Sequence, residues 1–296
     1  MEDFVVAILR YGTPLVYVTL AGVLAQRAGV WNLGLEGLMI IGSCASVVGF
    51  VQTGSLLFGF GLAIVACVLA SALLWFVVEK LRANAIIAGL GLTGLGLGGT
   101  DLAVQAVYGS QATVNAPYGL PRLGPAFGAF GVLSVLVAAM PFAVFLTWVV
   151  LRRTRFGLQL AACGEHPFAA RSVGADPSTM RLIALCAGGV FCALGGMELA
   201  LGSLTIFAYG MTAGRGFMAF SAVIFGAGHP LASVAAAFFF SIVGALGIRA
   251  QLIFGDRVPN DLLLALPYIA TIVGVWASAR LRGGGPTGGF GELRDY

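Results

Sequence analysis

Long apolar runs, separated by short polar stretches, dominate the chain. About 20 helical residues cross the hydrocarbon core of a membrane, and the runs do not alternate between apolar and polar positions as the strands of a membrane β-barrel would. The pattern therefore predicts an all-α, polytopic transmembrane helical bundle with about nine spans (eight to ten). The runs cover approximately residues 4–24, 31–51, 56–78, 85–108, 130–151, 182–202, 208–227, 231–250 and 261–279.

Composition supports a membrane protein and excludes a soluble one. The chain is 59% hydrophobic and 9% charged, whereas soluble domains are about 25% charged. Its 44 glycines suit a membrane bundle, because small residues let helices approach closely in lipid. The net charge of +4 is small and spread along loops, so nucleic-acid binding is not expected.

The one long polar interruption is the segment 152–181. Basic residues favour the cytoplasmic side of a membrane, and placing this segment there leaves most of the chain's basic residues inside. It is therefore predicted to be a cytoplasmic loop within a membrane domain of residues 1–282. The glycine-rich tail 283–296 is expected to be disordered and cytoplasmic, and with nine spans the N-terminus would lie outside. The segment contains Arg152, Arg153, Arg155, Arg171 and Arg181.

A short helix is predicted inside this loop. Proline favours the first turn of a helix, and glycine favours the position just past its end. Pro167 to Val173 should therefore be helical, with Gly174 as the residue that ends the helix. A capped helix on a basic loop between two spans is a shape suited to pressing on another protein.

A break in the helical pattern is expected near the N-terminus, in the sequence RAGVWNLGLEG at 27–37. Gly34 and Gly37 weaken a helix, since glycine costs about 1 kcal/mol relative to alanine. Glu36 stands in or beside an apolar run, where a carboxylate costs about 2.5–3.5 kcal/mol. Two interpretations stay open: Asn32 and Glu36 line a path for a polar solute, or they hydrogen-bond the neighbouring backbone.

Other unusual residues have structural interpretations. Glu198 and Arg215, in or near spans, are predicted to pair with each other. The spacing Gly89-x-Gly91-x-x-Gly94 matches a dinucleotide-binding loop but lacks its strand–turn–helix context. With Gly98, Gly94 instead predicts close packing of helices.

Four motifs, in order along the chain, together resemble one family. The resemblance is to permeases of ABC importers of the branched-chain amino acid, simple sugar and nucleoside type, and it is closest to the nucleoside and simple-sugar branch. Departures include His166 and Phe168 in the second motif and Tyr209 before the third. The motifs are Thr13-Pro14, Gly22 and Arg27-x-Gly29-Val30-x-Asn32-x-Gly34-x-Glu36-Gly37; Gly157, Gly164-Glu165, Pro167, Ala169-Ala170 and Gly174; Gly210 to Phe217 with Ala222 to Gly226 and Pro230; and Leu266-Pro267-Tyr268.

The resemblance implies a permease subunit that forms the path for a nucleoside or related small polar solute, with a ribose-like sugar as the alternative. Its implied partners are ATP-binding cassette ATPase subunits, a second permease subunit (identical or related) and an external solute-binding protein, in the bacterial cytoplasmic membrane. Candidate path residues are Asn32, Glu36, Thr212 and Arg215. The residues implied to contact the ATPase are Gly164, Glu165, His166, Pro167, Ala169, Ala170 and Arg171.

The chain has no phosphate-binding loop of the GxxxxGK[ST] type, and its single lysine, Lys80, precedes Leu81. ATP and Mg²⁺ are therefore expected on the partner ATPase, and no catalytic residue, cofactor or metal site is expected here. Two other classes compete with this interpretation. An ion-coupled secondary transporter would use Glu36, Asp101 and Glu198 as a relay, and a membrane anchor would leave the broken segment unexplained.

Overall fold

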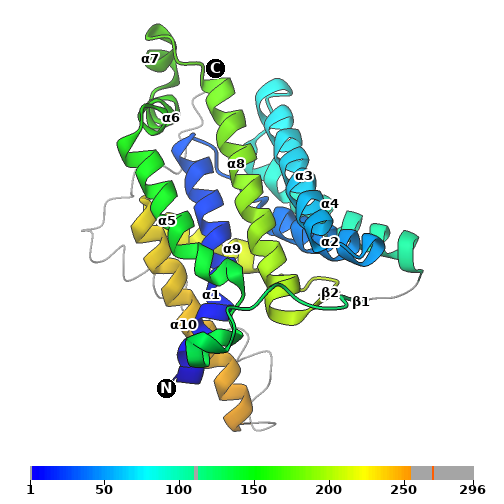
Figure 1. The fold of residues 1–296 in the computed structure, drawn as a ribbon. Helices are drawn as coiled ribbons and strands as arrows, with labels where there is room; N and C mark the ends of the chain where they lie inside the picture. Colours follow the sequence, from blue (N-terminus) through cyan, green and yellow to red (C-terminus); the bar gives the residue numbers. More distant parts are fainter. Residues whose placement is uncertain (1, 110–112, 255–268, 270–296) are drawn as a thin grey trace.

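The computed structural model describes residues 2–109, 113–254 and 269, and over them the chain is a bundle of long helices (Figure 1). Among these residues, seven helices are long and apolar enough to cross a membrane. Two of them, α3 and α8, continue as π-helices, at Phe76–Lys80 and Glu198–Leu204. The seven are α1 (Glu2–Arg27), α2 (Leu35–Thr53), α3 (Leu56–Trp75), α4 (Ala85–Tyr108), α5 (Val135–Arg153), α8 (Pro177–Met197) and α10 (Pro230–Phe254).

Shorter elements connect the long helices. The strands β1 and β2 pair antiparallel, with Val114 opposite Phe207, and so join the loop after α4 to the segment before α9. A 3₁₀ helix precedes α5 at Pro125–Val132. The other short elements are α6 (Arg155–Glu165), α7 (Pro167–Ser172), α9 (Arg215–Phe225), β1 (Thr113–Asn115) and β2 (Ile206–Ala208).

The prediction of a full span at 208–227 is wrong. The chain there forms β2 and a series of turns, and α9 has only 11 residues. Positive φ angles at Gly210 (66°), Ala213 (46°) and Gly214 (78°) interrupt any helix before Arg215. An apolar run gives no sign of such turns. The last predicted span, 261–279, and the tail 283–296 lie outside the described residues, apart from Ile269.

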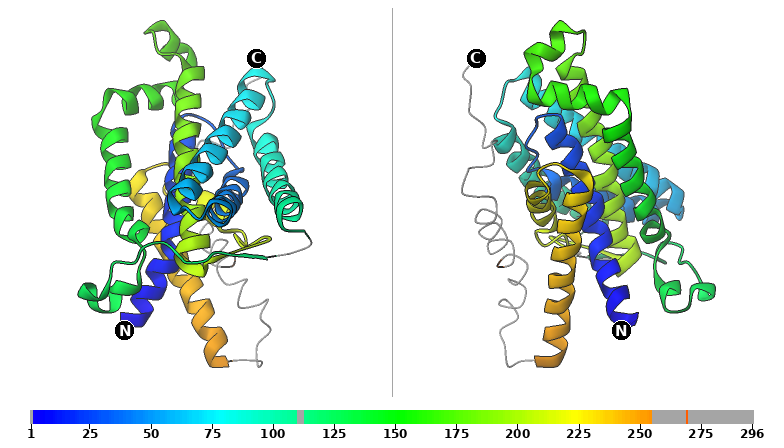
Figure 2. Two further views of the ribbon diagram at one scale, coloured as in Figure 1. Left: turned by 45° about the vertical axis from the view of Figure 1, so that its right-hand side comes forward. Right: turned by 90° about the vertical axis from the view of Figure 1, so that its left-hand side faces the viewer.

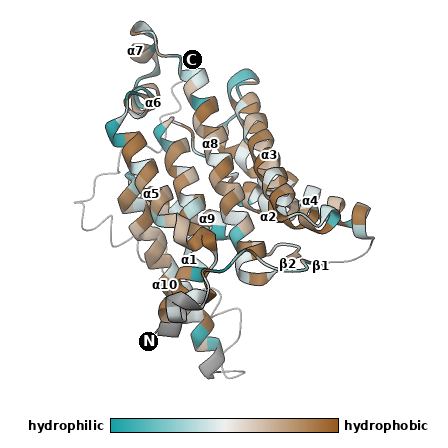
Figure 3. Cartoon of the chain, viewed as in Figure 1, coloured by the Kyte–Doolittle hydropathy of each residue, from teal (hydrophilic) through white to brown (hydrophobic). Residues whose placement is uncertain are grey.

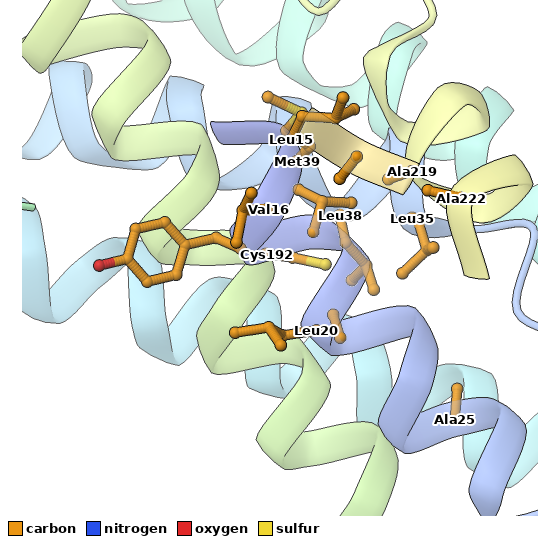
Figure 4. Close-up of a cluster of buried hydrophobic side chains, with 14 of the residues drawn as sticks. Leu15, Val16, Leu20, Ala25, Leu35, Leu38, Met39, Cys192, Ala219 and Ala222 are labelled. Atoms are coloured by element: carbon orange, nitrogen blue, oxygen red, sulfur yellow. The ribbon is translucent and has the colours of Figure 1, made fainter. Parts of the chain in front are cut away.

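The hydrophobic core lies where α1, α2, α8 and α9 meet (Figure 4). Helix α1 runs through the middle of the bundle. The helices α3 and α4 lie on one side of it, and α5 and α10 lie on the other (Figure 2). Small side chains on α9 let its short helix approach α1 and α2. Residues that meet in the core are Leu15, Val16, Leu20, Leu35, Leu38, Met39, Cys192, Ala219 and Ala222.

Close glycine packing occurs on α4, but not at the predicted pair. A Cβ at Gly94 or Gly98 would meet nothing within 4 Å, so the predicted packing through these two residues is wrong within the described chain. Instead, a Cβ at Gly96 would lie 2.8 Å from the Cα of Gly37, and one at Gly89 would lie 2.8 Å from the backbone nitrogen of Gly34. Helix α4 therefore packs through another face, directly against the start of α2.

Candidate functional site

The break expected near the N-terminus lies between α1 and α2, at residues 28–34, which we call the connector. Gly29 has a φ of +77°. The Asn32 side chain is 5% exposed, and its Oδ1 accepts a hydrogen bond of 2.8 Å from the Gly34 N–H. The hydroxyl of Thr93 on α4 donates to the carbonyl oxygen of Leu33 at 3.2 Å. The connector is therefore a fixed turn, and the second span begins at Leu35 rather than at residue 31.

Glu36, in the first turn of α2, binds the beginning of α9. Its side chain is 4% exposed. Its Oε1 accepts from the Gly214 N–H at 2.9 Å, and its Oε2 accepts from the Gly216 N–H at 2.5 Å. Free N–H groups and the positive end of the helix dipole make a helix N-terminus a favourable place for a carboxylate. This contact joins the broken N-terminal segment to the second break in the chain.

These contacts correspond to one of the two interpretations that the sequence left open. Asn32 and Glu36 both hydrogen-bond nearby backbone groups. A role for either residue in lining a solute path stays a prediction.

Arg215 and Glu198 do not form the predicted pair. The carboxylate of Glu198 accepts a hydrogen bond of 2.5 Å from the hydroxyl of Ser134, at the start of α5. The guanidinium of Arg215 lies 4.8 Å from the centre of the Tyr11 ring and donates to the carbonyl oxygen of Met211 at 3.0 Å. The pairing prediction is wrong because Tyr11 on α1 and Ser134 on α5, both distant in sequence, provide the partners.

Arg215 also lines a cavity of about 240 Å³ between α1, the π-helix after α8, and α10. Thr212, the other candidate of this segment, is fully buried, and its hydroxyl has no hydrogen-bond partner among the described residues. Tyr11 and Arg10 line the same cavity. Sequence analysis missed both, although an arginine within an apolar run is itself a signal of function.

The predicted short helix in the central segment is confirmed. Helix α7 spans Pro167–Ser172, Val173 caps it, and Gly174 follows with a φ of +84°. Ala170 is buried and packs against Cys163 and Ala175. The opposite face of the helix is turned outward, at the end of the molecule farthest from the N-terminus (Figure 1). Exposed residues at or just before α7 are Glu165, His166, Phe168, Ala169 and Arg171.

The central segment is tied to the connector by close contacts. A Cβ at Gly164, the tenth residue of α6, would collide with the carbonyl oxygen of Arg27 and lie 2.9 Å from the nitrogen of Gly29. The guanidinium of Arg181 donates to the carbonyl oxygen of Ala28 at 3.3 Å. It also forms an ion pair of 2.9 Å with Glu79, in the π-helix that follows α3. Helices α6 and α8 are therefore both in direct contact with the connector.

The α7 end of the molecule is strongly basic, and hydrophilic residues gather there (Figure 3). Burial, together with the charges of Arg152 and Arg27, lowers the pKa of His229. Hydrogen bonds from Thr179 lower the pKa of Asp176, which caps the start of α8. Basic residues at this end are Arg27, Lys80, Arg82, Arg152, Arg153, Arg155, Arg171 and Arg181.

Comparison with known proteins shows the family. Residues 4–275 match the model of the branched-chain amino acid transport system permease component. The guanosine ABC transporter permease protein NupQ of Bacillus subtilis is 35% identical, with 92% of this chain and 91% of the relative covered. The nucleoside ABC transporter permease protein NupC of Lactococcus lactis subsp. cremoris is 32% identical, over 92% of this chain and 91% of the relative.

A relative with another solute is also similar. The putative glucose ABC transporter permease protein TsgC13 of Haloferax volcanii is 31% identical, over 90% of this chain and 84% of the relative. No solved structure matches the chain. With its apolar helices and the family match over nearly its whole length, the chain belongs to the family of branched-chain amino acid-type ABC transport permease components, which are multi-pass membrane proteins rather than enzymes.

Proposed function

We propose that the chain forms the translocation path of an ABC importer for nucleosides. Support comes from the relatives named for guanosine and for nucleosides, which are similar to this chain over almost its full length. A monosaccharide is the second candidate, because a relative named as a putative glucose permease is nearly as similar. The bacterial cytoplasmic membrane would hold the protein, with a second permease subunit, identical or related, completing the path.

Energy would come from separate ATPase subunits, which bind ATP and Mg²⁺, while an external binding protein delivers the solute. The observation that carries this proposal is α7. It is a capped helix that projects from the basic end of the molecule. Its residue Ala170 is buried, whereas its residues Ala169 and Arg171 are exposed. We place this end, and the C-terminus, in the cytoplasm, because basic residues favour that side.

The contacts suggest how closure of the ATPases would reach the solute path. Movement of α7 and α6 would pass through Gly164 and Arg181 to the connector. The connector leads into α2, where Glu36 binds the backbone at the beginning of α9. Packed elements transmit such displacements as rigid bodies. The start of α9 would therefore move with α7.

Within the path, the four candidate residues would have different roles. Arg215, the first residue of α9, would contact the solute, whereas Thr212, which is fully buried, would shape the turn before α9 from behind the path. Asn32 and Glu36 would instead hold the backbone of the connector and of α9 in place, as their hydrogen bonds suggest. Substitution of Glu36 would then alter transport through α9 rather than through loss of a solute contact.

The test is to disrupt the exposed face of α7. Ala169→Asp places a charge on a surface that must fit a partner protein, so uptake should fall at least tenfold while the permease still reaches the membrane. Asn115→Asp adds the same charge to an exposed position in β1, away from α7 (Figure 1), and should leave uptake unchanged. Equal uptake by the two variants would remove the ATPase contact from the proposal. The measurement is uptake of radiolabelled guanosine and glucose by cells, with the permease quantified in membranes.

A further inference from the structure

The cavity beside α1 contains two arginines in a largely apolar setting. Its apolar walls include Leu199, on the π-helix after α8, and Ile248, on α10. Its polar side chains are Arg10 and Ser203, together with Arg215, the first residue of α9. An apolar cleft with a few fixed polar groups is typical of sites for small molecules.

Two polar atoms in this cavity lack a partner. The Nε of Arg215 and the hydroxyl of Ser203 are both buried without a hydrogen-bond partner among the described residues. Buried polar groups in folded proteins are nearly always hydrogen-bonded. Because the residues that carry these two atoms line the cavity, a bound ligand that accepts hydrogen bonds would give them partners.

The guanidinium groups are held in place. Arg215 lies over the ring of Tyr11 at 4.8 Å. A Cβ at Gly244 of α10 would approach a carbon of that ring to 2.5 Å, so α10 backs the ring closely. Arg10 donates to the carbonyl oxygen of Ser203 at 3.2 Å. Tyr11 is thus a positioning residue, and the two arginines present their remaining donors in a fixed geometry.

The chemistry of the cavity discriminates between a sugar and a base. Guanidinium groups only donate hydrogen bonds, and the described lining contains no Asp, Glu, Asn or Gln. A monosaccharide carries hydroxyl donors around its ring, and among the described lining side chains only the hydroxyls of Tyr11 and Ser203 can accept them. A nucleobase has flat apolar faces and an edge of carbonyl oxygens and ring nitrogens. Arginine binds such an edge bidentately, as it does O6 and N7 of guanine.

We propose that this cavity is a subsite for the nucleobase of the transported nucleoside, with Arg10 and Arg215 donating to its acceptor edge. The inference rests on the proposed importer function and adds which part of the solute is recognised. It also links the contacts at α9 to binding of the solute. Arg215 lies between Gly214 and Gly216, whose N–H groups bind Glu36, so movement of the connector would shift a group that contacts the solute.

The experiment uses the complete importer in proteoliposomes, with the external binding protein saturated by guanosine. Arg10→Gln and Arg215→Gln should each lower guanosine uptake about tenfold or more, since each removes a charged hydrogen-bond donor. Arg249→Gln is the matched control, because Arg249 is exposed on α10 and stacks on Phe4 at 5.5 Å. It should leave uptake unchanged. If Arg215→Gln does not fold, Ser203→Ala replaces it with a smaller expected loss.

A second solute identifies the contacting atoms. 7-Deazaguanosine lacks the ring nitrogen N7, and at saturation of the binding protein the wild-type importer should carry it more slowly than guanosine. The arginine variant that lacks the N7 contact should carry guanosine and 7-deazaguanosine at the same rate. The substitution and the missing nitrogen would each remove the same interaction, so their effects should not add. Additive losses in both variants would overturn the assignment of the guanidinium groups to the base edge.

Three further results would overturn the proposal. Uptake by both arginine variants equal to that of Arg249→Gln would show that the cavity does not contact the solute. A loss seen only in liposomes with anionic lipid, and not with zwitterionic lipid, would assign the cavity to a lipid headgroup. A wild-type importer that carries glucose but no nucleoside would refute the proposed solute itself. That failure appears in the wild type, whereas failure of the site appears only in the variants.

Discussion

Glu36 explains how a carboxylate is accommodated inside an apolar bundle. Both of its oxygens accept backbone N–H groups, from Gly214 and Gly216, and these charge-assisted bonds offset the cost of burial. The contact requires close approach, because the backbone of Gly216 lies directly against that of Glu36. A single glycine thus lets two helix starts meet around one charge.

This arrangement predicts a marked effect of a single methyl group. Gly216→Ala would place a Cβ in collision with the Glu36 backbone and 2.8 Å from its Oε2. Overpacking of this kind costs about 1–3 kcal/mol, so the melting temperature of the detergent-purified protein should fall. Gly98→Ala is the control, since a Cβ there meets nothing within 4 Å, and alanine is the better helix former. A melting temperature for Gly216→Ala at or above that of Gly98→Ala would contradict the tight contact.

At the scale of elements, the connector is held by three helices at once. Helix α6 packs on it through Gly164, α8 holds it through Arg181, and α4 holds it through Thr93. Arg27, just before it, donates to the carbonyl oxygen of Gly228 at 2.9 Å, in the turn between α9 and α10. A short irregular segment with so many partners moves only if its neighbours move together.

Gly164→Ala should therefore uncouple the importer. The new Cβ would collide with the carbonyl oxygen of Arg27 and lie 3.1 Å from the carbonyl carbon of Ala28, so α6 must separate from the connector. We expect ATP hydrolysis by the assembled complex to continue while guanosine uptake falls at least fivefold. Both are measured in the same proteoliposomes. Gly61→Ala on α3, where the Cβ is unobstructed, should retain the wild-type ratio of uptake to hydrolysis, and an unchanged ratio in Gly164→Ala would refute transmission through this contact.

At the scale of the whole molecule, the basic α7 end and the opposite end, where α1 begins, define the direction of the bundle across a membrane. Most described basic residues lie at the α7 end, and the N-terminus of α1 lies at the other (Figure 2). A cytoplasmic α7 therefore requires an external N-terminus. If α7 lay outside the cell, the N-terminus would have to lie inside.

Cysteine labelling of intact cells tests this orientation. Val173 is 82% exposed at the end of α7, and Asn115 is exposed in β1. Val173→Cys should react with a membrane-impermeant maleimide only after the cells are opened, whereas Asn115→Cys should react in intact cells. The wild type is a suitable background, because four of its five cysteines are buried and Cys186 is partly buried. The reverse pattern would place α7 outside and exclude a cytoplasmic ATPase contact.

Local chemistry accounts for what could be predicted from residues alone. The length of the apolar runs predicted the helical bundle, and proline and glycine at the two ends of α7 predicted its limits within a residue. These features depend on neighbours in sequence, which is why they could be recognised. The apolar run at 208–227 was wrongly predicted to be a full span for the same reason. Its turns are held by contacts with Glu36 and with β1, which are distant in sequence.

Hydropathy, charge and capping are properties of single residues and their neighbours, so the sequence was enough to predict a membrane bundle with a basic, helix-bearing loop. The partners of the charged side chains inside the bundle became known only from the fold. Glu36 accepts a hydrogen bond from Gly214, 178 residues further along the chain. Glu198 accepts one from Ser134, and the guanidinium of Arg215 lies over the Tyr11 ring. Which charges meet depends on how the helices pack, and many pairings are compatible with the same apolar pattern.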